Sequence, residues 1–175
     1  MPRRLSALLA AALALPAVAQ DAAEPIIRMD NPAALALALR EEGYRAKLSK
    51  SDSGRPMILS GTSGVNYDIH FYFCDDDGVA CEGLLFSAGF DLRNGIGLAA
   101  MNDWNRDRLV GRAFTDEDCD PTIDFFISTD GEFLEKDFLV LLADWDKAVT
   151  DFREFIGFGD EDGRIATDCA DTDAI

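Results

Sequence analysis

The sequence is poor in basic residues and has no long apolar run. Its 175 residues include 16 Lys and Arg against 33 Asp and Glu, which gives a formal net charge of −17. Phosphate binding needs clustered Lys and Arg, so this balance argues against a nucleic-acid groove. No run of about 18 apolar residues occurs, which argues against a membrane-spanning helix. Because 48% of the residues are hydrophobic, we nonetheless expect one packed core.

Motifs of common hydrolases and zinc sites are also missing. His70 is the only histidine, and it alternates with apolar residues in step with Asn66 and Asp68, so we expect it to face solvent. There is no Gly-x-Ser-x-Gly motif for a serine nucleophile and no CxxC pair for zinc. The sequence therefore predicts no catalytic residue, no cofactor and no enzymatic activity.

An acidic segment, residues 116–127, invites comparison with a calcium-binding EF-hand loop. Four aspartates have the spacing of the first, third, fifth and ninth positions of that loop. Pro121 stands where the loop requires glycine, and Ile127 where it requires glutamate, so we predict no dedicated metal site. The four aspartates are Asp116, Asp118, Asp120 and Asp124.

The start of the chain, residues 1–19, has the three parts of a secretory signal peptide. Two arginines precede the apolar run Leu5–Val18, and a small-x-small pattern ends at Ala19, where we expect cleavage. A lipid anchor would need a cysteine directly after the apolar run, and the first cysteine is Cys74. We therefore expect a soluble periplasmic or secreted protein with no stable membrane anchor.

Export changes the interpretation of the four cysteines, because an even count in an oxidising compartment indicates disulfides. Cys74 and Cys81 flank a polar turn between two apolar runs. Strand ends at such a turn can bring the two Cα atoms within the range that a disulfide requires. We predict a Cys74–Cys81 disulfide and, by elimination, a Cys119–Cys169 disulfide that ties the C-terminal tail to a loop.

Apolar periodicity predicts three helices and six strands. The expected helices are Ala33–Glu42, opened by Asn31 as cap and Pro32, then Ile96–Arg106, and a long helix from Phe133 that Gly157 closes. The expected strands are Tyr44–Ser49, Met57–Ser60, Val65–Phe73, Leu84–Asp91, Val110–Phe114 and Thr122–Ser128.

This order predicts an α+β fold, α-βββ(β)-α-ββ-α, with helices packed on an antiparallel sheet. We expect a flexible leader over residues 20–31, a single domain over 32–157 and an acidic tail over 158–175. Phe125 and Phe126 are adjacent and point to opposite faces of one strand. An aromatic ring on the second face predicts cover by a helix or by a second copy, and we expect a homodimer.

Several segments together are similar to one known family. Met101–Arg106 reads MNDWNR and resembles the Asn-x-Trp-Asn segment of the YbjN-like family of bacterial sensory transduction regulators. Residues 38–44 resemble the start of that family's domain, and residues 69–90 resemble its central hairpin. The resemblance spans residues 32–156. It implies a fold similar to type III secretion chaperones, which are small, acidic and often homodimeric, and it implies no known catalytic residue or cofactor.

Asn102, Trp104 and Asn105 lie together on the helix that carries this motif. They could bind a partner, with tryptophan as the anchor. We favour a structural interpretation, in which the ring packs on the sheet and the amides bond neighbouring backbone. The sequence as a whole predicts an exported, non-enzymatic module that binds or regulates an unidentified protein, and the alternative is a protein that binds a small ligand or a divalent cation.

Overall fold

The first helix begins where its capping residues predict. The computed structural model describes residues 24–159, in which α1 spans Pro32–Glu41. The side chain of Asn31 accepts hydrogen bonds from the main-chain N–H groups of Ala33 and Ala34. Proline at the first helical position costs no hydrogen bond, because its missing N–H would have had no partner inside the helix.

Six strands form one antiparallel sheet in the order β2-β3-β4-β5-β7-β6. Apolar and polar side chains alternate along β4, where the odd-numbered residues are buried, as the sequence predicted. The predicted α+β class is confirmed. The strands are β2 (Lys47–Lys50), β3 (Pro56–Thr62), β4 (Val65–Tyr72), β5 (Gly83–Gly89), β6 (Arg112–Thr115) and β7 (Pro121–Ser128).

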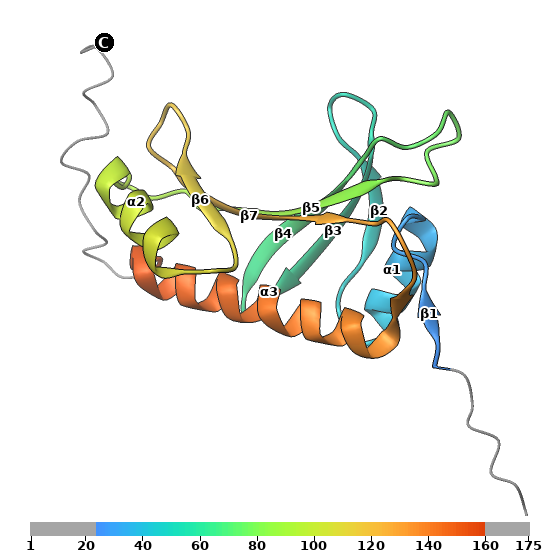
Figure 1. The fold of residues 1–175 in the computed structure, drawn as a ribbon. Helices are drawn as coiled ribbons and strands as arrows, with labels where there is room; N and C mark the ends of the chain where they lie inside the picture. Colours follow the sequence, from blue (N-terminus) through green and yellow to red (C-terminus); the bar gives the residue numbers. More distant parts are fainter. Residues whose placement is uncertain (1–23, 160–175) are drawn as a thin grey trace, which may run out of the picture.

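The other two helices are α2 (Leu98–Asp107) and α3 (Glu135–Ile156). Figure 1 shows α3 running beneath the sheet, with α1 near one end of it and α2 near the other. The core lies between the sheet and α3, where Trp145 is fully buried and its ring centroid lies 5.6 Å from that of Phe86. The opposite face of the sheet, here called the outer face, carries none of the helices of residues 24–159 (Figure 1).

The segment before α1 departs from its prediction. We expected residues 20–31 to be a flexible leader, and for the described part, residues 24–31, this is wrong. β1 (Ile26–Ile27) pairs with β8 (Phe133–Leu134), and Met29 is buried in the core. A strand of two residues carries no periodicity, and its partner lies far along the chain, so the sequence gives no local signal of the pair.

The predicted Cys74–Cys81 disulfide is present and closes the turn between β4 and β5. Cys81 also holds the N-terminal segment, because its N–H donates to the carbonyl of Asp30 over 2.9 Å. The hydroxyl of Thr129 in turn donates to the carbonyl of Cys81. Cys169 lies outside the described residues, so the Cys119–Cys169 pairing stays a prediction.

The predicted signal peptide over residues 1–19 also lies outside the described part of the chain. Across residues 24–159, none of the helices combines the length and the apolar character needed to cross a membrane.

Candidate functional site: the open edge of β7

The motif on α2 ties this helix to the first residues of β6. Trp104 is buried, and its Nε1 donates to the carbonyl of Gly111 over 2.9 Å. Asn105 clamps Ala113: its Nδ2 donates to the Ala113 carbonyl, and its Oδ1 accepts from the Ala113 N–H over 2.8 Å. Asn102 is exposed and makes no such bond among the described residues. Trp104 and Asn105 therefore have the structural contacts that we favoured, while Asn102 does not.

Gly111 lies in the turn that leads from α2 into β6. Its φ is +84°, and a Cβ atom built there would lie 2.5 Å from Cδ1 of Ile123. Only glycine fits this conformation and this contact without strain. The bond from Trp104 to the Gly111 carbonyl fixes the turn, and β6 therefore begins at Arg112.

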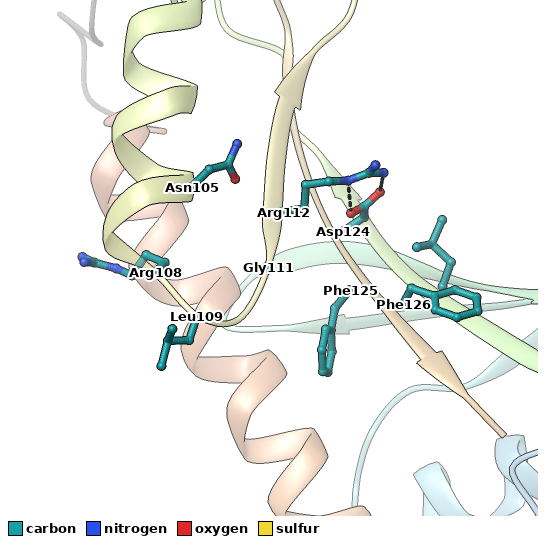
Figure 2. A pocket seen from close by; sticks show the side chains of 9 residues that line it. Asn105, Arg108, Leu109, Gly111, Arg112, Asp124, Phe125 and Phe126 are labelled. Carbon is teal, nitrogen blue, oxygen red and sulfur yellow. Dashed lines mark hydrogen bonds and ion pairs between the residues drawn. The ribbon is translucent and has the colours of Figure 1, made fainter. Parts of the chain in front are cut away.

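Because β6 begins only at Arg112, it pairs with only part of β7. Arg112 pairs with Asp124, and this is the last pair between β6 and β7 on this side. β7 continues to Ser128, and over Phe125–Ser128 it pairs with β5 alone. Within residues 24–159, no strand therefore pairs with this edge of β7 beyond Asp124, and Figure 2 shows the strand continuing past the start of β6.

A groove lies beside this open edge, with a volume of about 680 Å³. Figure 2 shows Leu109 and Phe125 pointing to one side of β7 and Phe126 to the other. Leu109 is fully exposed, and Phe126 is 53% exposed on the outer face. We call this site the edge groove; it is lined by Leu85, Asn105, Arg108, Leu109, Gly111, Arg112, Asp124, Phe125 and Phe126.

One ion pair sits at the upper end of the edge groove. Arg112 holds Asp124 with two hydrogen bonds, Nε to Oδ1 at 3.0 Å and Nη2 to Oδ2 at 2.5 Å. Asp124 is only 4% exposed, and a buried charged group costs free energy unless it is paired and hydrogen-bonded. The hydrogen bonds and the nearby carboxylate raise the pKa of Arg112 above its ordinary value. The outer side of the arginine remains open to solvent.

The register places a row of side chains across the outer face beside the edge groove. Met57, His70, Leu85 and Phe126 are successive partners on β3, β4, β5 and β7. His70 lies on the polar side of β4, as expected, but it is half-buried by these neighbours rather than fully solvated. This desolvation lowers the pKa of His70, and the charge of Arg55 lowers it further, while Asp68 opposes the shift.

The aspartates of the calcium-like segment have other partners. Asp116 accepts main-chain hydrogen bonds from Asp118 and Asp120, and Asp120 accepts one from Leu92. Asp124 is held by arginine. Within residues 24–159 no three acidic, histidine or cysteine side chains form a group that could hold a metal ion.

The fold and the edge groove together define an α+β domain with an exposed, partly apolar sheet edge. A model of the YbjN family, described as "Putative bacterial sensory transduction regulator", matches residues 31–158. The chain belongs to this family. None of the curated proteins searched matches the chain.

Sequence reasoning did not bring the residues of the edge groove together, although four of them stood out for separate reasons: Asn105, Asp124, Phe125 and Phe126. Gly111 and Arg112 lay inside the predicted strand Val110–Phe114, whereas β6 begins only at Arg112. Leu109 carried no prediction, and the site depends on β6 being shorter than β7. One local signal was present. Gly111 follows the apolar pair Leu109–Val110 and precedes a short strand, and a glycine in this position indicates a turn at which strand pairing stops.

Proposed function

We propose that this protein is an exported, non-enzymatic regulatory module that acts by binding another protein through the edge groove. The family description supports a regulatory role. The observation that carries the proposal is an unpaired strand edge with an exposed apolar side chain on each of its two sides, Leu109 and Phe126. Apolar side chains gathered at one surface site mark an interaction site more often than scattered ones do.

Two further observations support this reading of the edge groove. Central aromatic side chains and arginines dominate the binding energy of protein interfaces, and Phe126 and Arg112 both line the edge groove. The groove is also open to solvent along β7, which suits a protein segment better than an enclosed small molecule.

Export is part of the proposal and rests on residues 1–19 of the sequence together with the disulfide. A disulfide persists in an oxidising compartment and is rare in the cytosol. Cell fractionation and N-terminal sequencing of the native protein test this part: we expect a mature chain that begins at Gln20 in the exported fraction, and an intact N-terminus in the cytosol would contradict it.

Affinity capture from the native exported fraction tests the binding role. The baits are the wild-type chain, Leu109→Ser in the edge groove and Leu37→Ser on α1, since both leucines are exposed. We expect one reproducible protein on the wild type and on Leu37→Ser that is lost on Leu109→Ser. Capture that ignores Leu109, or no capture at all, would overturn the proposal.

If no protein is captured, the alternative becomes the favoured function, namely binding of a small ligand or a divalent cation. A thermal-shift screen of cations and metabolites against the full chain then follows, and a reproducible rise in Tm with one compound would identify the ligand class.

A further inference from the structure

The open edge of β7 presents main-chain hydrogen-bonding groups as well as apolar side chains. The N–H of Thr129 donates to the carbonyl of Glu82, and the N–H of Phe90 donates to the carbonyl of Pro121. In an antiparallel ladder, each residue directs both of its main-chain groups to the same neighbour, and successive residues alternate. The odd-numbered residues of β7 therefore bond with β5.

The even-numbered residues of β7 direct their groups to the other side. Asp124 meets Arg112 of β6 there, but Phe126 and Ser128 lie beyond the last pair. Within residues 24–159 no hydrogen bond reaches the N–H or the carbonyl of either residue on this side. Two donors and two acceptors in strand geometry thus point away from β5 along this side of β7, and those of Phe126 belong to the edge groove.

This edge differs from the other free edge of the sheet. β2 has the sequence Lys-Leu-Ser-Lys, and lysines on an edge strand discourage pairing with another chain. The open part of β7 has no such charge and carries Phe126 instead. Proteins normally protect an unpaired edge strand from pairing, for example with charged residues. An edge that is apolar and lacks this protection is suited to the addition of another strand.

The side chains around the edge specify what would fit. An added strand in line with β6 would place alternate side chains on the two faces of the sheet. On one face they would meet Leu109 and Phe125, which are apolar, and on the other they would meet Phe126 and the exposed side of Arg112 (Figure 2). Asp124 is already paired with Arg112, and Arg108 adds a second positive charge to the lining.

We infer that the partner docks as an added β-strand on the Phe126–Ser128 edge of β7, through an extended segment that alternates apolar and acidic residues. The inference rests on the proposed function and names the chemistry of the partner. The apolar residues would cover Leu109 and Phe125, and the carboxylates would face Arg112. The net charge of −17 does not forbid an acidic segment, because at about 0.15 M salt charges more than about 8 Å away are largely screened.

Synthetic peptides on the full chain test this inference directly. The probe is acetyl-Glu-Val-Glu-Val-Glu-amide, and two variants carry N-methyl groups on the valines or on the glutamates. A strand directs alternate N–H groups to opposite sides, so only one methylated set should face β7. We expect one variant to lose at least about tenfold in affinity and the other to keep its affinity, since each main-chain bond contributes about 1 kcal/mol.

Three controls complete the test. The peptide acetyl-Lys-Val-Lys-Val-Lys-amide should bind more weakly, and Leu109→Ser should weaken binding while Leu37→Ser should not. Amide hydrogen exchange should slow at Phe126 and Ser128 when the glutamate probe binds. Equal binding of both methylated peptides, no binding of the unmodified probe, or unchanged exchange at these two amides would overturn strand addition.

The two proposals fail separately. A partner captured in a Leu109-dependent manner, together with no peptide binding, would keep the proposed function and overturn strand addition. Binding of the probe to the wild type with the alternating methylation pattern supports strand addition even before the natural partner is known.

Discussion

At the scale of single residues, two side chains of the Asn-x-Trp-Asn motif fix the main chain that borders the edge groove. Trp104 and Asn105 each bond to the main chain around β6, so both side chains have a structural partner. The sequence predicted that the tryptophan would be buried, because large aromatic residues on a helix usually pack. It could not predict which carbonyl its N–H would meet, since Gly111 reaches it only after the chain has turned.

Replacing Trp104 tests this structural role. Trp104→Ala should lower the free energy of unfolding by about 3–5 kcal/mol, as expected for a large aromatic removed from a core. Trp104→Phe keeps much of the packing but loses the hydrogen bond to Gly111. It should lower the free energy of unfolding by about 1–2 kcal/mol beyond the effect of the smaller ring. Urea unfolding measures both, and a stable Trp104→Ala variant would contradict the role.

The two asparagines of the motif provide a matched pair. Asn105→Ala removes both bonds to Ala113 and should destabilise the fold by about 1–3 kcal/mol. Asn102→Ala removes an exposed side chain and should change stability by less than about 0.5 kcal/mol. Equal losses in chemical unfolding would show that Asn105 does not clamp β6.

His70 should make stability depend on pH. Because burial lowers its pKa below the ordinary value of 6.5, the unfolded chain binds the proton more readily than the folded chain. Stability is therefore full above about pH 6.5 and falls as the pH decreases below it. Compared with His70→Gln, the wild type should lose more stability between pH 7 and pH 5 in urea unfolding. A steeper loss in His70→Gln would contradict the sign.

At the scale of elements, local signals predicted most helices and strands, and long-range pairing escaped them. The cap at Asn31 and the alternation along β4 were visible in the sequence and are present in the structure. β1 and β8 were missed, because each has two residues and is defined only by its pairing with the other. The edge groove was missed for a related reason: it depends on the relative lengths of β6 and β7.

The turn at Gly111 should tolerate no side chain. Gly111→Ala adds a Cβ in left-handed backbone and against Ile123, while Gly43→Ala has nearly the same φ, +86°, with open space around it. Gly43→Ala should cost about 1–2 kcal/mol, and Gly111→Ala should cost about 1–3 kcal/mol more because of overpacking. Thermal unfolding compares them, and equal costs would mean that the contact with Ile123 is relieved without penalty.

The disulfide should stabilise the hairpin and the segment that Cys81 holds. Replacing Cys74 and Cys81 by serine should destabilise the fold by about 2–3 kcal/mol, because the closed loop is short. Limited proteolysis should then cut first near the turn or before α1. Unchanged stability in the double variant, or free thiols in the native protein, would contradict this account.

At the scale of the whole molecule, net charge and the outer face bear on the homodimer that the sequence predicted. The sequence predicted both the acidic surface and an aromatic ring on the second face, and Phe126 is exposed there. The structure contains one chain, so the expected homodimer stays a prediction. Two copies of like charge repel each other, so pairing through the outer face should strengthen as salt screens this repulsion.

Sedimentation at several salt concentrations tests self-association. We expect a dimer whose association constant rises with salt, and Phe126→Ser should weaken it while Val140→Ser, an exposed apolar position on α3, should not. A monomer at every salt concentration would remove the homodimer from the account and leave the edge groove free for a different protein.

The central claim is that the edge groove binds the regulatory partner. The measurement that tests it most directly is amide hydrogen exchange of the full chain with and without the captured partner. We predict that protection rises in residues 108–112 and 125–128 and stays unchanged in α1 and β2. Protection confined to other elements, or none in the presence of a saturating partner, would contradict the account.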